Sequence, residues 1–230
     1  FVSGLLCGDG RDQGAFIQGA FRGNFAIIGF AFVRNAYGDQ ALGRAAFVLA
    51  IIMPIYNILS IIALTVPLHR EKALSLRITL KTIITNPLIL ALIIALPFSM
   101  LQIAVHPIIR QSIDYLAALA LPLALIGIGS SLDFHRIRKS QRLSIVATVL
   151  KITVMPALGT AAAVLLGFRS QDLGILYFMF AAPTAIVSYI MATAMGSNGE
   201  LAGDIVLMST IASIFTISAG IYILRVLGLF

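Results

Sequence analysis

Two places in the chain, 160 residues apart, carry residue types that interrupt a helix and leave polar atoms at the interruption. Gly23 and Asn24 form one pair, and Pro183 and Thr184 form the other, each inside a long apolar stretch. Proline lacks a backbone N–H and clashes with the preceding turn, while glycine gives backbone freedom and asparagine both donates and accepts hydrogen bonds. Half-helices that restart there direct free N–H groups and partial positive charge at the break. The two pairs predict one anion-binding site suited to a carboxylate, although Pro183 taken alone is also compatible with a simple kink.

Three charged side chains lie well inside apolar stretches, away from their ends, where a charge is costly. Burying an arginine at the centre of a membrane helix costs roughly 2.5–3.5 kcal/mol on insertion scales, so Arg22 and Lys151 should each face a cavity or a partner. Both are candidates to attract or hold the anion, but Arg22 could instead extend its flexible stem towards the membrane surface. Asp114 is a candidate carrier for a coupling proton or sodium ion, or a structural residue near the outer interface.

A weaker candidate and several missing motifs complete the chemical inventory. Ser188 lies one turn beyond Thr184 and is expected to face the same cavity. The sequence has no glycine-rich phosphate loop and no His-Glu-x-x-His zinc motif. The apolar stretches hold no nucleophile–base constellation either. We therefore predict that the protein is not an enzyme and needs no metal or cofactor, apart from a coupling proton or sodium ion.

The elements that position these residues are membrane helices. Hydrophobic residues make up 60% of the chain and charged residues 11%, whereas soluble domains carry roughly 25% charged residues. A membrane helix needs about 20 apolar residues, and stretches of that kind recur at 14–35, 41–68, 87–105, 108–131, 144–167, 174–195 and 204–227. This pattern predicts an all-α polytopic membrane protein, embedded in the lipid bilayer. The net charge of +7 is explained by topological anchors, so no nucleic-acid partner is expected.

The same plan occurs twice along the chain. Residues 14–68 and 174–228 superimpose without a gap at an offset of 160, and each consists of an interrupted span, a short polar turn and an unbroken span. Paired interrupted helices in two halves are typical of a transporter's midplane binding site. We predict that residues 1–68 are the remainder of a first inverted repeat, with a broken helix at 14–35 and a helix at 41–68. Residues 69–86 are predicted to form a cytoplasmic basic linker. Residues 87–230 are predicted to form a complete second repeat, with its broken helix at 174–195.

The orientation in the membrane follows from the basic connections. Each of the connections 69–86 and 132–143 holds four Lys or Arg residues. Basic connections stay on the cytoplasmic side, which places both of them inside and the C-terminus outside.

Four motifs in order resemble the bacterial branch of the auxin efflux carrier family. Gly19–Gly29 resembles its broken fourth helix, and Asn86–Ala91 resembles the start of its sixth helix. Leu121–Leu132 resembles its seventh helix, and Ala182–Ala192 resembles its broken ninth helix. The resemblance implies two inverted five-helix repeats with crossed discontinuous helices, as in sodium/proton antiporters and bile-acid symporters. It also implies a protein of the bacterial inner membrane that handles carboxylates such as malate and malonate. By this alignment the first two to three helices precede residue 1.

The resulting hypothesis is a secondary transporter of small carboxylate anions that works by alternating access at the crossing of two broken helices. Two alternatives stay open from the sequence. One is a sodium- or proton-coupled symporter or exchanger of the bile-acid-symporter type, and the other is a membrane receptor or assembly partner that does not transport. A homodimer is one arrangement to be expected for such a chain.

Overall fold

The computed structural model describes residues 2–69, 103–131 and 137–230, together with Leu90, Ile94, Pro97, Phe98, Met100 and Leu101. The predicted linker 69–86, the predicted span 87–105 and the first part of the predicted loop 132–143 lie almost entirely outside these residues. The described part of the chain is helical, and its elements are α1 (Val2–Leu6), α2 (Gly10–Phe21), a π-helical turn η1 (Phe25–Gly29), α3 (Phe30–Tyr37), α4 (Asp39–Thr65), a 3-10 turn η2 (Pro67–His69), α7 (Pro107–Ser131), α8 (Ile137–Val149), a π-helical turn η3 (Leu150–Val154), α9 (Met155–Leu165), α10 (Ser170–Ala181), α11 (Val187–Ala194) and α12 (Gly199–Val226).

Three described helices are long and apolar enough to cross a membrane. They cover Asp39–Thr65, Arg142–Leu165 and Gly199–Val226, with mean hydropathies of 2.4, 1.7 and 1.8 in their most apolar windows. These helices confirm the spans predicted at 41–68, 144–167 and 204–227 to within a few residues. The predicted all-α polytopic membrane fold is therefore confirmed.

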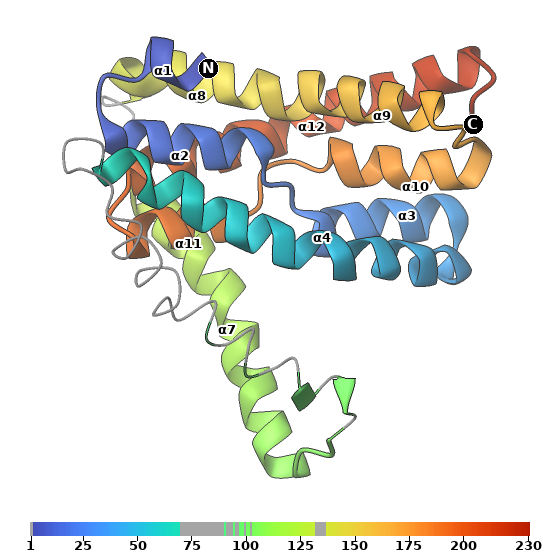
Figure 1. The fold of residues 1–230 in the computed structure, drawn as a ribbon, viewed down its shortest axis with the longest axis horizontal. Coiled ribbons are helices and arrows are strands. Elements are labelled where there is room, and N and C mark those ends of the chain that lie inside the picture. The colour runs from blue at the N-terminus through green and yellow to red at the C-terminus, as the bar shows by residue number, and fades with distance from the viewer. Residues whose placement is uncertain are drawn as a thin grey trace.

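The helix boundaries repeat at the offset seen in the sequence. Helices α2 and α10 begin at residues 10 and 170 and end at 21 and 181, and α4 and α12 begin at 39 and 199. Figure 1 shows α2 and α10 running towards each other from opposite ends of the bundle, while α4 and α12 run in opposite directions. The equivalent helices of the two halves are thus inverted relative to each other.

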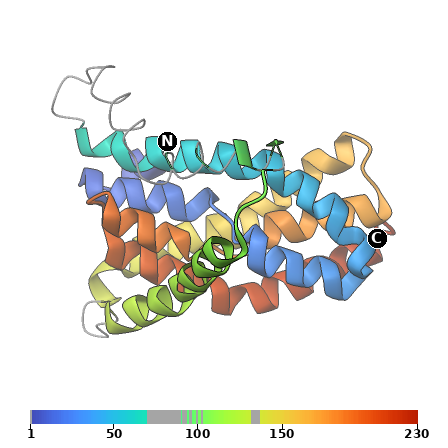
Figure 2. The same ribbon diagram turned by 90° about the horizontal axis from the view of Figure 1, so that it is seen from below.

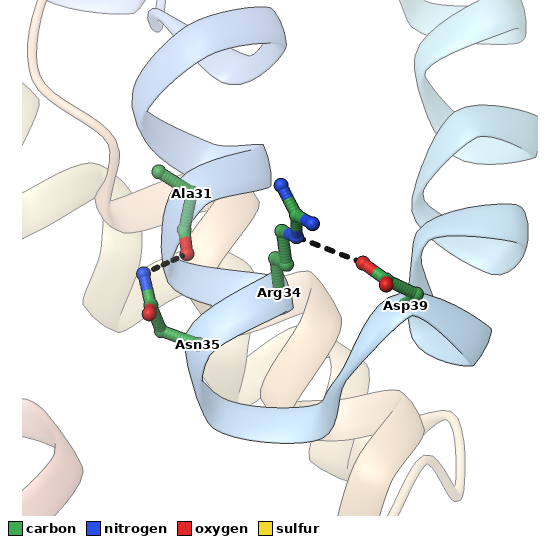
Figure 3. Close-up of polar contacts among 4 residues, drawn as sticks. All are labelled: Ala31, Arg34, Asn35 and Asp39. Carbon is green, nitrogen blue, oxygen red and sulfur yellow. Dashed lines mark hydrogen bonds and ion pairs between the residues drawn. The ribbon is translucent and has the colours of Figure 1, made fainter.

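The connections that follow the broken helices occupy equivalent places and are closed by different residues. Gly38 ends α3 with a φ of +77°, a left-handed conformation that glycine adopts readily. Around this turn Arg34 Nε lies 2.8 Å from Asp39 Oδ1, and Asn35 Nδ2 donates to Ala31 O at 2.7 Å (Figure 3). At the equivalent position Asn198 caps α12, because its Oδ1 accepts from Leu201 N at 3.0 Å.

Two apolar clusters pack the bundle, one on each side of its middle. The first joins α2, α8, α11 and the start of α12, and includes Phe16 and Met191. The second joins α3, α10, the start of α4 and the end of α12, and includes Val33 and Phe178. The break in each broken helix falls between the two clusters, which hold the half-helices on either side of it.

Helix α7 stands apart from this bundle. It touches α11 and α12 and then diverges from the other helices (Figure 1), passing across them in the view of Figure 2. Large apolar side chains along it are exposed, among them Ile108, Leu116 and Leu123. Asp114, the candidate carrier of a coupling ion, also lies on this helix and is exposed.

Candidate functional site

The two interruptions predicted from the sequence meet in space. Gly23 and Thr184 pair as an isolated antiparallel bridge, and Asn24 N donates to Pro183 O at 2.7 Å. A break in a membrane helix exposes backbone polar groups that lipid cannot satisfy. Here the backbone of one break supplies hydrogen-bond partners for the backbone of the other, so the four residues form a shared crossing.

The crossing follows the internal repeat. At the offset of 160, Gly23 is equivalent to Pro183 and Asn24 is equivalent to Thr184. Exchanging the two repeats therefore replaces the pair Gly23–Thr184 by the pair Pro183–Asn24, which is the neighbouring pair of the same crossing. A pseudo-twofold axis therefore passes through this point. The two breaks thus satisfy each other's backbone groups in a nearly symmetric way.

Gly23 is needed for its size. Its backbone is not among the left-handed conformations of this chain, so the conformational freedom expected from the sequence is not the reason for a glycine here. A Cβ at this position would stand 2.7 Å from Cε1 of Phe25. The aromatic ring of Phe25 therefore occupies the space that any larger residue would require.

Asn24 begins the second half of its broken helix. Its carbonyl accepts from Ile28 N at 3.1 Å and from Gly29 N at 3.2 Å, which starts the π-helical turn η1. The side chain is buried and makes no capping bond to this turn. Among the described residues the side-chain amide has no hydrogen-bond partner. It is therefore available to a ligand at the crossing.

Thr184 is fully buried and committed to protein contacts. Its hydroxyl donates to Gly19 O at 2.8 Å, which satisfies a carbonyl near the end of α2. Its backbone N–H donates to Ser209 Oγ on α12 at 3.0 Å. Thr184 thus ties three helices together at the crossing. Ser209 was not identified from the sequence because it is one of several Ser and Thr residues in its span, with no spacing that distinguishes it.

Arg22 lies directly before the crossing, and its carbonyl accepts from Ala185 N at 3.0 Å. The guanidinium is buried and turns towards α4, where Nη1 donates to Ser60 Oγ and Nη2 to Asn57 Oδ1, both at 2.7 Å. It also contacts Met191 Sδ at 3.2 Å. All of these acceptors are neutral, and within the described chain no carboxylate balances the charge.

Lys151 is the second buried cation near the crossing, with 2% of the residue exposed. It lies in the π-helical turn η3 and donates from Nζ to Phe180 O at 2.9 Å. This carbonyl belongs to the last turn of α10, where a helix carries partial negative charge. The Lys151 ammonium group is therefore held by a neutral carbonyl, that of Phe180, which lies three residues before Pro183.

Buried polar atoms without partners lie beside these residues. Ser188, in the first turn of α11, is fully buried, and its Oγ has no hydrogen-bond partner within the described chain. The same is true of Oε1 of Gln18, whose Nε2 contacts Met191 Sδ at 3.4 Å. Buried polar groups are normally satisfied, so these atoms mark places where a polar ligand or water can complete the site.

The structure thus brings together most of the residues selected from the sequence. Gly23, Asn24, Pro183 and Thr184 form the crossing itself, while Arg22, Ser188 and Lys151 surround it. Asp114 lies elsewhere, on α7. Among the described residues no group of three or more His, Cys, Asp or Glu side chains is placed to hold a metal ion.

Comparison with known proteins identifies the family of the chain. Residues 2–221 match the family model described as membrane transport protein. An uncharacterized transporter of Methanothermobacter thermautotrophicus is 24% identical over 105 residues, which are 46% of this chain and 35% of that protein. The matched part thus spans about a third of the relative's length, and no solved structure matches the chain. Because the family model covers nearly all 230 residues, the chain belongs to the membrane transport protein family, that of the auxin efflux carriers.

Proposed function

We propose that this protein is a secondary transporter of small organic anions, specifically carboxylates of the malate and malonate type. The anion binds at the crossing of the two broken helices, and alternating access exposes this site first to one side of the membrane and then to the other. The observation that carries the proposal is the backbone pairing of Gly23 with Thr184, which places two half-helix N-termini at one point.

The charge of these N-termini suits one carboxylate. The second half-helices begin at Phe25 and Val187. Because Ser188 N and Tyr189 N already donate to the carbonyls of Ala185 and Ile186, the aligned peptide dipoles rather than free N–H groups would attract the anion at α11. Each N-terminus is equivalent to roughly half a positive charge, so the two together offset about one negative charge.

The buried cations add to this field. Arg22 and Lys151 are held by neutral oxygens and a sulfur rather than by carboxylates. A buried charge with neutral partners is costly, and an anion at the crossing would lower that cost. The amide of Asn24 is available to orient the anion, since it can donate two hydrogen bonds.

The driving force follows from the charge of the cargo. A membrane potential is worth about 2.3 kcal/mol per charge per 100 mV, which suffices to drive an anion outwards, whereas import requires a coupled proton or sodium ion. Asp114 remains the candidate carrier for such an ion. We place the protein in the bacterial inner membrane with 69–86 and 132–143 in the cytoplasm, and a homodimer is compatible with the exposed apolar face of α7.

Uptake and efflux of labelled malate and malonate in cells expressing the full-length gene test this proposal. We expect saturable flux that Asn24→Ala abolishes, with the protein still present in the membrane. Asn35→Ala is the matched control, because this asparagine is exposed and bonds only to the Ala31 carbonyl of its own helix. Flux that survives Asn24→Ala would refute the site. Binding of the acids without flux would instead indicate a receptor, and the absence of both would refute the substrate class.

A further inference from the structure

A second concave feature lies away from the crossing, in the half of the bundle that contains the C-terminus. It is a groove of about 610 Å³ between α9, α10 and α12. Small residues on the facing helices open it, among them Ala157 and Ala161 on α9 and Ala219 on α12. Tyr177 of α10 also lines the groove, and its hydroxyl donates to Ile217 O at 3.0 Å. The polar atom of this lining residue is therefore satisfied inside the protein, and the groove is predominantly apolar.

The length of the groove corresponds to one leaflet of a bilayer. Its lining residues recur every three or four positions along η3 and α9, from Ile152 to Leu165, a distance of about 20 Å at the helical rise of 1.5 Å per residue. The hydrocarbon core of a bilayer is about 30 Å thick, so a single leaflet contributes about 15 Å. The groove therefore runs from near the midplane to the membrane surface, as an acyl chain does.

A basic residue stands at the surface end of this groove. Arg169 donates from Nη1 to Val164 O and Phe168 O, both at 2.7 Å, and Val164 is itself a lining residue. The ion pairs found in the described chain, Arg34–Asp39 and Arg44–Asp172, do not include Arg169. Arginine suits phosphate because its planar fork makes two parallel hydrogen bonds. The positive charge thus lies where a lipid phosphate would lie.

We propose that this groove binds an acyl chain of an anionic phospholipid, with the lipid phosphate held by Arg169. The site is separate from the crossing, and it would exist whether or not the protein carries carboxylates.

The internal repeat supplies a comparison within the same molecule. A groove of about 420 Å³ lies between α2 and α4, and four of its eight lining residues correspond to lining residues of the first groove at an offset of 160. The corresponding pairs are Ile17 with Tyr177, Leu59 with Ala219, Ala63 with Ile223 and Pro67 with Leu227. The position equivalent to Arg169 is occupied there by Asp9, which would repel an anionic head group. The preference for an anionic lipid is therefore specific to the groove that Arg169 flanks.

Fluorescence quenching by brominated lipids tests the proposal, because these 230 residues contain no tryptophan. Leu165→Trp places a reporter at the mouth of the groove, and Phe47→Trp places one on the lipid-exposed face of α4; the native side chains are 87% and 70% exposed. The full-length protein, with any tryptophan outside these 230 residues replaced by phenylalanine, is reconstituted in phosphatidylcholine vesicles that contain a small fraction of brominated phosphatidylglycerol or brominated phosphatidylcholine. The ratio of the two quenching efficiencies cancels differences in the depth of the reporters.

We expect brominated phosphatidylglycerol to quench Leu165→Trp roughly fivefold more efficiently than brominated phosphatidylcholine, the preference that one basic residue at the surface provides. The ratio should be about one at Phe47→Trp. Adding Arg169→Gln should return the first ratio to about one, whereas Arg225→Gln, an exposed arginine at the same end of the bundle, should leave it unchanged.

Three results would overturn the proposal. An equal ratio at the two reporters would mean that no anionic lipid is selected. Weak quenching of Leu165→Trp by both lipids would mean that a helix or a second copy covers the groove. Loss of the preference on addition of soluble glycerol phosphate would mean that Arg169 binds a free phosphate and that the groove plays no part.

Discussion

Gly174 lies so close to the phenol oxygen of Tyr37 that a Cβ on the glycine would overlap it. The same contact exists in the other half, where a Cβ on Gly14 would stand 3.0 Å from Ser197 Oγ. At the offset of 160, Gly14 is equivalent to Gly174 and Tyr37 is equivalent to Ser197. The first half-helix of each repeat thus packs on the connection that follows the broken helix of the other repeat. The two halves interlock at both ends, as well as at the crossing between them.

This interlock predicts that Gly174→Ala destabilises the protein. Overpacking typically costs about 1–3 kcal/mol, and here the obstacle is the oxygen of Tyr37. Thermal unfolding in detergent should show a lower midpoint for Gly174→Ala, and Tyr37→Phe should restore part of the loss in the double variant. Gly43→Ala is the control, because nothing lies within 4 Å of its added Cβ in α4. That control should be neutral or stabilise the helix by about 0.5–1 kcal/mol, and equal effects of the two alanines would contradict the interlock.

The hydroxyl of Thr184 predicts a loss of stability that transport assays alone would not identify. Thr184→Val keeps the shape but leaves Gly19 O without its donor, and an unsatisfied buried group costs about 1–3 kcal/mol. Thr184→Ser should retain most of the stability, because it keeps the hydroxyl. Thermal unfolding measures this effect, and the KM for transport in the surviving protein should change little. A large rise in KM with unchanged stability would show that the hydroxyl binds the anion instead.

Much of the architecture could be predicted from the sequence because membrane helices and their interruptions have strong local signals. The offset of 160, read from apolar stretches and polar turns, also relates the boundaries of α2 to those of α10. The pairing of Gly23 with Thr184 follows once two inverted repeats are assumed, since equivalent breaks must then meet on the axis. These features depend on residue type and on periodicity along the chain.

The contacts of the site could not be predicted in the same way. The partners of Arg22 include Asn57 and Ser60, which lie 35 and 38 residues away, and their distance depends on how α4 packs beside α2. The small size required at Gly23 is imposed by the ring of Phe25, a rotamer that no sequence pattern reports. Side-chain rotamers and helix rotations are set by packing, which single-sequence reasoning does not resolve.

The orientation of the bundle predicts a pattern of chemical labelling. Native Cys7 is buried, and burial together with nearby Asp12 raises the pKa of its thiol, so it should react slowly. In a Cys7→Ser background, a membrane-impermeant maleimide added to intact cells should label Asn35→Cys and spare Gly8→Cys. Both native positions are exposed. Gly8 lies in the connection between α1 and α2 and Asn35 in the last turn of α3, and that connection and the end of α3 are at opposite ends of the bundle (Figure 1). Permeabilised cells, in which both variants should react, provide the control, and labelling of Gly8→Cys alone in intact cells would reverse the topology.

Two variants, Arg22→Met and Asn57→Leu, test whether the Arg22 guanidinium serves the stability of the protein or the binding of the anion. Arg22→Met removes a buried charge that has no carboxylate partner, which favours the folded state, but it also leaves Ser60 Oγ and Asn57 Oδ1 without their donor. Because the two effects oppose each other, Arg22→Met should lower the unfolding temperature less than Asn57→Leu does. Asn57→Leu keeps the charge but removes an acceptor 2.7 Å away, which should cost about 1–3 kcal/mol.

If the charge of Arg22 attracts the anion, Arg22→Met should raise the KM for carboxylate flux at least about tenfold, which corresponds to about 1.4 kcal/mol of lost binding. Asn57→Leu should change this KM much less, because the positive charge remains. The two variants therefore differ in what they change most: Arg22→Met should lose more affinity than stability, and Asn57→Leu should lose more stability than affinity. Wild-type KM in Arg22→Met, with a lowered unfolding temperature, would instead assign Arg22 to the packing of α2 against α4.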